Sequence, residues 1–275
     1  MNIIDGKEIQ NYFKNELKQR VSNISDSLKL IVFQVGDNSA SDIYVNNKKK
    51  LCEELGIICE IKKYSEIDEK DLIREIGVCN NDKDVTGIMV QLPLPDYIDE
   101  DKVIESINPL KDVDGLTTVN AGKLVLGSKS LVPCTALGII KMLEYKNIPV
   151  EGKNVVIVGR SRLVGLPLQS LFLNKNATVT VCHSKTSDLK SITKIADILV
   201  VAIGKKEYID SSFIKDDAVI IDVGINRENN KIYGDCNFED LKSKASLITP
   251  VPGGVGLMTV VMLINNLIEA YYLQN

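Results

Sequence analysis

The amino-acid sequence predicts an α/β protein with two open, mostly parallel α/β domains and a cleft between them. The chain has 275 residues, which exceeds one ordinary hydrophobic core and suits two domains. In both halves, short apolar runs alternate with amphipathic helical patterns, as in parallel sheets covered by helices. A glycine-containing loop follows one such run in the second half, and open sheets bind ligands beyond the carboxyl ends of their strands.

The composition argues against several classes of function. A net charge of −4, no Trp and five Phe argue against a nucleic-acid surface. The six cysteines lie far apart without a Cys-x-x-Cys motif, so we expect reduced, mostly buried thiols. His183 is the only histidine, which argues against a histidine-ligated metal or a Ser-His-Asp triad, and we expect no metal site.

We expect a cytoplasmic protein that does not span a membrane. The start of the chain, Met1–Lys7, has no apolar signal core. The uncharged stretch 245–268 is long enough for a membrane span, but the prolines and glycines in its first half break a spanning helix. We interpret this stretch as a loop that runs into a buried helix.

The first half predicts an amphipathic helix followed by a β-α-β-α-β unit. The nearly continuous apolar run 28–35 is typical of a parallel strand covered on both faces. The predicted order is helix 7–21, strand 28–35, helix 41–56, strand 57–63, helix 69–80, strand 86–92 and helix 99–107.

The predicted helix 41–56 carries the first candidate residue. Ser41 and Asp42 suit its N-cap, and Gly56 suits a left-handed C-terminal cap. The helical period places on one stripe Tyr44, Lys48, Leu51, Cys52 and Leu55. Lys48 interrupts this otherwise apolar stripe. It is either a snorkelling lysine that covers the core edge or a partly desolvated amine with a lowered pKa that accepts protons.

Two further polar residues are expected at the carboxyl edge of the first sheet. Prolines stop the strand 86–92 and leave Gln91 at its mouth, and Asp114 follows in a loop rich in turn residues. Taken singly, Gln91 is a polar strand-end residue and Asp114 is an Asp-Gly turn former.

The second half predicts a Rossmann-like nucleotide-binding domain. Strand 154–158 runs into a glycine loop and a helix, although Ser161 replaces the second glycine of G-x-G-x-x-G and Gly165 comes one residue late. The remaining predicted elements are helix 135–146 capped by Thr135, the helix that ends near 174, strands 178–182, 198–202 and 218–223, and a buried closing helix 259–271.

The end of strand 178–182 favours NADP over NAD. It lacks the acidic residue that binds the ribose of NAD. A 2′-phosphate instead suits a set of donors formed by Arg160, Ser161, Ser184 and Lys185. We interpret His183 as a solvent-facing strand-end residue. The later run 250–256, with two prolines and three glycines, permits close approach to a flat ligand or serves the fold alone.

Together these motifs resemble the methylenetetrahydrofolate dehydrogenase/cyclohydrolase family over nearly the whole chain. The matching motifs are Tyr-x-x-x-Lys at 44–48, Val-Gln-Leu-Pro at 90–93, Pro-x-Lys-Asp-Val-Asp-Gly at 109–115, Gly-Arg-Ser-x-x-Val-Gly-x-Pro at 159–167 and Pro-Gly-Gly-Val-Gly at 252–256. Two positions depart from the family pattern, because Leu257 and Ala136 stand where prolines are usual. Both departures bear on the shape of the folate-side loop.

The resemblance implies a role for each matched residue. Lys48 is the central catalytic group, Tyr44 packs on the folate, and Gln91 tunes Lys48. Asp114 holds the pterin ring. The implied folate-binding set is Tyr44, Lys48, Val90, Gln91, Leu92, Asp114, Pro252, Gly253, Gly254, Val255 and Gly256, and the implied NADP-binding set is Gly159, Arg160, Ser161, Ser184 and Ile225.

The resemblance also implies domains and chemistry. We expect a folate-binding catalytic domain in residues 1–146 and 258–275, an NADP-binding domain in 147–257, and a homodimer. Similar enzymes move a hydride from 5,10-methylene-tetrahydrofolate to NADP⁺ and then hydrolyse the methenyl cation to 10-formyl-tetrahydrofolate. Hydride transfer needs positioning, whereas hydrolysis needs a proton acceptor, and this favours the second interpretation of Lys48.

Three other functions stay open. One is a folate dehydrogenase that is monofunctional or uses NAD. Another is a nucleotide-binding protein without catalysis, although the complete set of catalytic motif residues argues against it. A dehydrogenase of amino or hydroxy acids ranks lower, because the second domain has no obvious acid-base group beside the nicotinamide.

Overall fold

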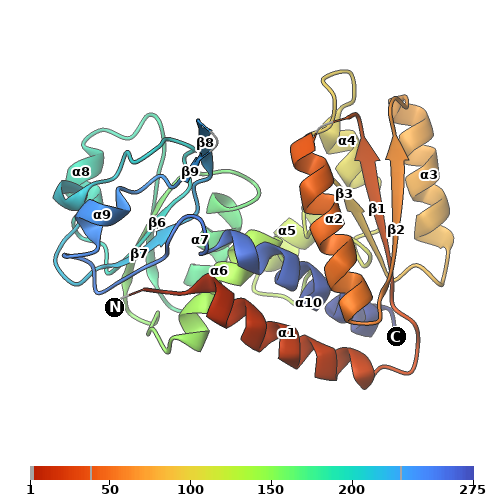
Figure 1. The fold of residues 1–275 in the computed structure, drawn as a ribbon, viewed down its shortest axis with the longest axis horizontal. Helices are drawn as coiled ribbons and strands as arrows, with labels where there is room; N and C mark the ends of the chain where they lie inside the picture. The colour runs from red at the N-terminus through yellow and green to blue at the C-terminus, as the bar shows by residue number, and fades with distance from the viewer. Residues whose placement is uncertain (1–2, 38, 230) are drawn as a thin grey trace. The chain divides into compact units, whose positions relative to one another are not determined.

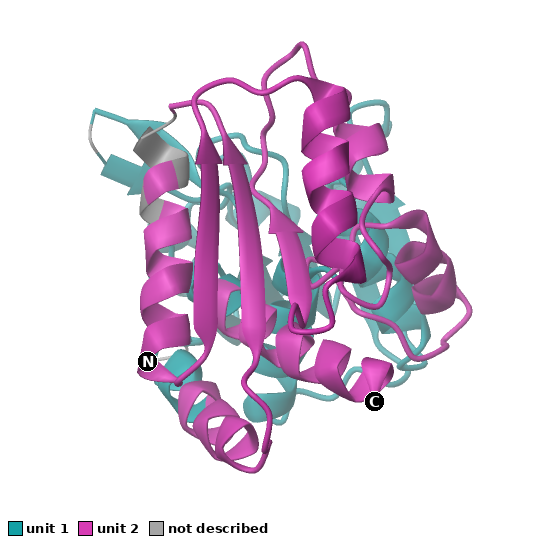
Figure 2. Ribbon diagram, turned by 90° about the vertical axis from the view of Figure 1, so that its right-hand side faces the viewer, with its two compact units in different colours: residues 1–12, 133–259 teal, residues 13–132, 260–275 magenta. Residues whose placement is uncertain are grey.

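The computed structural model describes residues 3–37, 39–229 and 231–275, which form two compact α/β units (Figures 1 and 2). Unit 1 contains the chain up to Tyr12 and Pro133–Thr259, and unit 2 contains Phe13–Val132 and Val260–Asn275. Each unit has its own parallel sheet, so the predicted class of two mostly parallel α/β domains is confirmed.

Unit 2 is built on a three-stranded parallel sheet in the order β2-β1-β3. Its strands are β1 (Lys29–Val35), β2 (Ile58–Tyr64) and β3 (Gly87–Val90). Its helices are α2 (Ser39–Glu54), α3 (Glu69–Asn81), α4 (Glu100–Glu105), α5 (Thr118–Val125) and most of α1 (Gly6–Ser22) and α10 (Gly256–Gln274). The central strand β1 is buried in all but its first residue, as its continuous apolar run predicts.

Helices cover both faces of this sheet, and two ion pairs identify which face each helix covers. Lys62 of β2 pairs with Glu75 of α3 at 3.1 Å, and the next residue, Lys63, pairs with Asp42 of α2 at 2.9 Å. Because successive strand residues point to opposite faces, α2 and α3 lie on opposite sides of β2. Figure 1 shows α2 beside β1 and β2.

Unit 1 contains a five-stranded parallel sheet in the order β10-β7-β6-β4-β5 and an antiparallel hairpin, β8-β9. Its strands are β4 (Asn154–Val158), β5 (Thr178–Cys182), β6 (Ile198–Val201), β7 (Val219–Asp222), β8 (Asn226–Glu228), β9 (Lys231–Tyr233) and β10 (Leu247–Ile248). Its helices are α6 (Cys134–Tyr145), α7 (Gly165–Leu173), α8 (Leu189–Thr193), α9 (Phe238–Leu241) and the 3₁₀ turn η1 (Ser211–Phe213).

The boundary between the two compact units lies between Val132 and Pro133, whereas the domain boundary predicted from the sequence lies between residues 146 and 147. Helix α6 packs on α7 and belongs to unit 1, whose longer segment begins at Pro133. The N-terminal residues join the same unit through the bond from Ile4 N to Ile248 O at 2.9 Å.

Helix α10 is, among the described residues, the one helix with the length and apolar character of a membrane span. Half of its most apolar window is buried inside the chain. Asn266 on this helix donates to the main-chain oxygens of Val113 and Val132 at 2.8 and 2.7 Å. These contacts are typical of a core helix, and the chain before α10 is a loop, as predicted.

The predicted caps are partly wrong. Helix α2 begins at Ser39, so Ser41 and Asp42 lie inside it, and Asp42 instead accepts from Gln34 and Lys63 on the sheet. The side chain of Ser41 lies outside the described residues. Thr135 is inside α6 and its hydroxyl lies 3.1 Å from that of Thr259. Gly56, with φ +74°, confirms the predicted left-handed end of α2.

Candidate active site

The amine of Lys48 lies inside unit 2 rather than in solvent. Lys48 is 6% exposed, and its Nζ donates to Gln91 Oε1 at 2.8 Å. A snorkelling lysine keeps its head group in water, so this placement contradicts the snorkelling interpretation. The helix α2 and the end of β3, far apart in sequence, therefore bring the two predicted residues together.

The carbonyl of the Gln91 amide faces the amine because the rest of the residue is fixed. Gln91 N donates to Phe33 O at 2.8 Å, which holds the backbone against β1. Its Nε2 donates to Leu92 O at 2.7 Å, so only the carbonyl end of the amide is directed at Lys48. A neutral acceptor orients the amine without adding a negative charge.

Lys111 is a second buried lysine in the same unit, and its contacts are those of an amine with a structural role. It is 5% exposed and donates to Cys79 O at 3.1 Å and Asp82 O at 2.5 Å, at the C-terminal end of α3. Burial lowers the pKa of Lys111. Its partners are main-chain carbonyls at a helix end, whereas Lys48 meets a side chain at the carboxyl edge of the sheet.

Asp114 reaches the same edge because its loop runs alongside β3. Ile88 and Asp112 form a parallel bridge, and Ile88 N donates to Lys111 O at 2.7 Å. Asp114 follows in the turn that Gly115 N closes by donating to Asp112 O at 3.0 Å, and its side chain is half-buried. The buried carboxylate of Asp112 holds the loop, accepting from Thr117 N and Asn120 Nδ2.

The remaining folate-side residues of unit 2 surround this edge. Tyr44 is 37% exposed and precedes Lys48 by one helical turn. Val90 is buried at the end of β3, and Leu92 is half-buried just after it. The edge thus combines an exposed aromatic ring with an amine, an amide and a carboxylate.

In unit 1, the glycine loop after β4 has the close packing that a dinucleotide site requires. Gly159 has φ +125°, and a Cβ there would overlap Ala202 O. A Cβ on Gly165, the first residue of α7, would overlap Gly159 O. Gly165 therefore performs the task of the third fingerprint glycine despite its late position. Arg160 and Ser161 between them are exposed.

The predicted 2′-phosphate residues lie at neighbouring strand ends. Val158 of β4 and Cys182 of β5 are register partners, so Arg160 and Ser184 follow the same edge of the sheet. His183 forms a turn there: its N donates to Thr186 Oγ1 at 2.8 Å, and its Nδ1 accepts from Lys185 N at 3.2 Å.

Two buried carboxylates at this edge are not predicted from the sequence. Asp235, with no exposed surface, accepts from the consecutive amides of residues 203–205 after β6 and from Asn226 Nδ2. Asp222 accepts from the amides of Gly224, Asp235 and Cys236. Together they tie the loops after β6 and β7 to one another and hold the segment that presents Ile225, which is 46% exposed.

The loop 252–256 belongs to unit 1. Gly253 O accepts from Gly6 N at 2.9 Å, and a Cβ on Gly6 would overlap the carbonyls of Gly253 and Gly254. A Cβ on Gly256 would lie 3.7 Å from Ile225 Cδ1. The loop thus lies beside a predicted NADP residue, and Val255 within it is buried.

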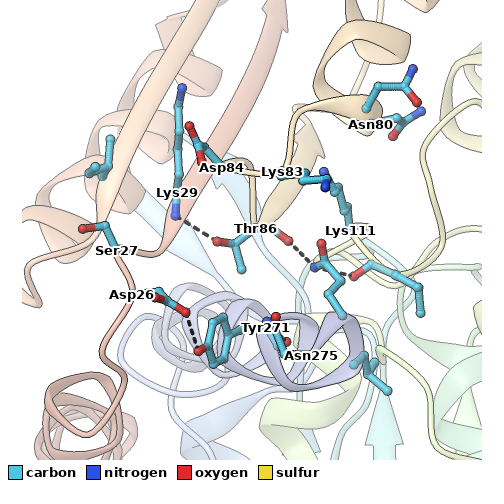
Figure 3. A pocket seen from close by; sticks show the side chains of 15 residues that line it. Asp26, Ser27, Lys29, Asn80, Lys83, Asp84, Thr86, Lys111, Tyr271 and Asn275 are labelled. Carbon is cyan, nitrogen blue, oxygen red and sulfur yellow. Dashed lines mark hydrogen bonds between the residues drawn. The ribbon is translucent and has the colours of Figure 1, made fainter.

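A cavity of about 970 Å³ in unit 2 is separate from these residues (Figure 3). Its lining includes Lys29 and Thr86 at the amino ends of strands and the end of α10, where Tyr271 donates to Asp26 at 2.7 Å. Gln274 Nε2 also donates to Thr86 O at 2.9 Å. The candidate catalytic residues lie at the opposite, carboxyl edge of this sheet.

The raised pKa of the buried Asp222 carboxyl leads us to expect that the stability of the protein depends on pH. Burial raises its pKa to about 6, above the ordinary value of about 3.9, so the folded state binds its proton more tightly than the unfolded state. Its contribution is fully present below about pH 4 and is lost as the pH rises through about 6, by about 3 kcal/mol in total. Urea unfolding at pH 4.5 and 7.5 should show the wild type losing stability relative to Asp222→Asn. An unchanged difference would mean that the three amides keep the carboxylate ionised in the folded state.

Both halves of the chain match models of one protein family. The family model "Tetrahydrofolate dehydrogenase/cyclohydrolase, catalytic domain" matches residues 4–114, and the NAD(P)-binding domain of that family matches 133–275. The chain is 51% identical over 274 residues to "Bifunctional protein FolD" of Agathobacter rectalis, covering 98% of each. The bifunctional enzyme FolD-methylenetetrahydrofolate dehydrogenase/cyclohydrolase from Campylobacter jejuni is 43% identical, with 100% of each chain covered and a TM-score of 0.97.

A second solved structure has a lower sequence identity to this chain. The methylenetetrahydrofolate dehydrogenase-cyclohydrolase of Trypanosoma brucei, complexed with NADP cofactor and inhibitor, is 33% identical, covers 99% of this chain and 97% of that one, and has a TM-score of 0.93. These similarities confirm the resemblance that the motifs predict. The chain belongs to the tetrahydrofolate dehydrogenase/cyclohydrolase family.

Proposed function

We propose that the protein oxidises 5,10-methylene-tetrahydrofolate with NADP⁺ and hydrolyses the resulting methenyl cation to 10-formyl-tetrahydrofolate. Family membership supports both activities. The observation that carries the proposal is the buried Lys48 amine, 2.8 Å from Gln91 Oε1 at the carboxyl edge of the β2-β1-β3 sheet. Hydrolysis needs a general base, and a buried amine positioned by a neutral amide can serve as one.

Hydrolysis is assigned to Lys48 with Gln91 as its positioning partner. Burial disfavours the charged ammonium, and a cationic folate beside it disfavours it further. The neutral amine accepts a proton from the water that adds to the methenyl carbon. The Gln91 carbonyl accepts a hydrogen bond from the Lys48 amine and so keeps the lone pair of that amine oriented. The Gln91 amide is itself held in place because its Nε2 donates to Leu92 O.

Folate recognition is assigned to the residues around this pair. Asp114 accepts from the amino-pyrimidine edge of the pterin, whose donors suit a carboxylate. Tyr44 offers its exposed ring to the flat folate. Val90 and Leu92 supply apolar contact, and we assign the loop residues Pro252, Gly253, Gly254, Val255 and Gly256 to the same substrate.

NADP⁺ binding is assigned to the carboxyl edge of the unit 1 sheet. The close packing of Gly159 and Gly165 fits a pyrophosphate at the start of α7. Arg160, Ser161 and Ser184 suit a 2′-phosphate, and Ile225 offers apolar contact. When bound, the nicotinamide accepts the hydride, while the chain supplies position and orientation.

We extend the assignment to the two units, the oligomeric state and the cellular compartment. Unit 2 is assigned as the folate-binding catalytic domain and unit 1 as the NADP-binding domain. We also propose a homodimer in the cytoplasm, as the family resemblance implies.

Purified protein mixed with methylene-tetrahydrofolate and NADP⁺ tests the function. NADPH should appear first, and methenyl-tetrahydrofolate should then be hydrolysed. The initial rate with NAD⁺ should be lower than with NADP⁺. NADPH formation without hydrolysis would leave a monofunctional dehydrogenase, and nucleotide binding without folate binding would leave a non-catalytic protein.

Gln91→Glu should slow hydrolysis by about 10- to 10³-fold, because an opposite charge raises the pKa of a nearby amine by about 1–3 units. The rate should recover at higher pH. Hydrolysis of methenyl-tetrahydrofolate followed from pH 6 to 10 measures both effects, with NADP⁺ affinity as the control. A variant with wild-type hydrolysis at neutral pH would contradict the role assigned to this amide.

A further inference from the structure

Helix α2 carries a second chemical feature one turn beyond Lys48. Cys52 follows Lys48 by four residues on the same inward stripe and has no exposed surface. Cys59 is in β2 and is partly exposed. Both residues belong to unit 2.

The fold brings these two cysteines to the same place. Cys59 and Lys63 point to one face of β2, and Lys63 pairs with Asp42 near the start of α2. The helix therefore runs antiparallel to the strand, so a later residue of α2 meets an earlier residue of β2. The tight return between the two elements is closed by Ile57 N, which donates to Cys52 O at 2.8 Å.

The side chains of Cys52 and Cys59 therefore face each other across this turn. Their interaction, together with the charge of Lys49, lowers the pKa of Cys59. The same interaction and burial raise the pKa of Cys52. Burial alone or chiefly raises the pKa of Cys79, Cys182 and Cys236, so Cys59 differs from these three thiols.

We propose that Cys52 and Cys59 form a reversible disulfide switch that lowers folate turnover when a hydroperoxide oxidises the protein. This inference rests on the proposed function for its effect on turnover, whereas disulfide formation itself is independent of that function. The site has a partly exposed attacking sulfur on β2 and a buried resolving sulfur on the facing side of α2.

The oxidation balances in two steps. The Cys59 thiolate attacks one peroxide oxygen, the O–O bond breaks, and hydroxide leaves as Cys59 sulfenic acid forms. Cys52 Sγ then attacks the Cys59 sulfur, the S–O bond breaks, and the departing hydroxide combines with the Cys52 proton as water. Two thiols are oxidised, and the peroxide is reduced to the level of water. A dithiol reverses the bond by exchange.

The bond should disturb catalysis because it moves the helix that carries Lys48. Cys52 and Cys59 are free thiols, and unbonded sulfurs lie further apart than the disulfide length of about 2.05 Å, so cross-linking draws the end of α2 toward β2. A displacement of about 1 Å at a catalytic group can cost about 100-fold in rate. We therefore expect at least a tenfold loss of methenyl-tetrahydrofolate hydrolysis.

Trypsin provides a direct assay, because cleavage after Lys50 and Lys62 releases a peptide, 51–62, whose two cysteines are the proposed pair. The reduced full chain is assayed first, treated with hydrogen peroxide, alkylated with iodoacetamide and digested. We expect this peptide to lose two hydrogens and escape alkylation as hydrolysis falls, with both changes reversed by dithiothreitol. NADP⁺ affinity should stay unchanged.

Cys59→Ala is the main variant because Cys59 is partly exposed, and Cys79→Ala on α3 is its matched control. Cys59→Ala should resist peroxide, and Cys79→Ala should respond as the wild type does. The proposal fails if peptide 51–62 stays reduced, if the disulfide forms without loss of hydrolysis, or if Cys59→Ala loses activity equally. No hydrolysis in the reduced wild type would refute the proposed function instead, while the peptide mass still decides whether the disulfide forms.

Discussion

Replacing Lys48 by methionine is expected to slow hydrolysis of methenyl-tetrahydrofolate by about 10²- to 10⁴-fold, the range for loss of a general base. Methionine has a similar length and suits a position that is 6% exposed, so the fold should persist. The change removes the amine and its bond to Gln91 Oε1. Stopped-flow absorbance of the methenyl compound measures the effect without the dehydrogenase step.

The control for this variant is NADP⁺ binding, which is assigned to unit 1 and should be nearly unchanged. Lys49→Met is the matched substitution, because Lys49 is adjacent in α2 but pairs with Glu53 at 4.0 Å on the helix surface. It should hydrolyse the substrate at close to the wild-type rate. Wild-type hydrolysis in Lys48→Met would refute the assignment of the base.

Gly159→Ala is expected to abolish measurable NADP⁺ binding and to destabilise unit 1. A side chain at φ +125° costs about 1–3 kcal/mol in backbone strain. The new Cβ would also overlap Ala202 O, so β4 and the residue after β6 must move apart. We expect a total loss of about 3 kcal/mol or more in the free energy of unfolding. Fluorescence titration with NADPH and urea unfolding measure the two effects.

Gly152→Ala separates backbone strain from steric overlap. Gly152 has φ +70° in the same unit, but a Cβ there meets nothing within 4 Å. This variant should lose stability by about 1 kcal/mol and keep its NADP⁺ affinity. Equal NADP⁺ affinity in Gly159→Ala and the wild type would contradict the placement of the pyrophosphate at this loop.

The sequence predicts much of the fold because local signals and tertiary packing agree. The apolar run of β1, the glycine at the end of α2 and the strand-loop-helix after β4 all occur where the patterns place them. Lys48 could be singled out because a lone charge on an apolar stripe is conspicuous. Its partner Gln91 could be singled out because prolines end its strand at the ligand edge.

The features that escaped prediction depend on contacts between distant segments. Helix α5 is only eight residues long, although Thr117, which caps it by accepting from Asn120 N, was an available signal. The hairpin β8-β9 is short and polar, so its strands lack an apolar alternation. The role of Asp235 depends on amides more than 30 residues away, which no local pattern reports.

The most direct test of the central claim is an NMR titration of the Lys48 amine, in protein labelled with nitrogen-15 at the lysine side chains and assigned through Lys48→Met. The spectra are recorded with NADP⁺ and a non-reacting cationic folate present. We predict that this amine loses its proton well below the ordinary lysine value of about 10.4. An amine that stays protonated up to or beyond that value cannot be the base at neutral pH, and the proposed hydrolysis mechanism would then be wrong.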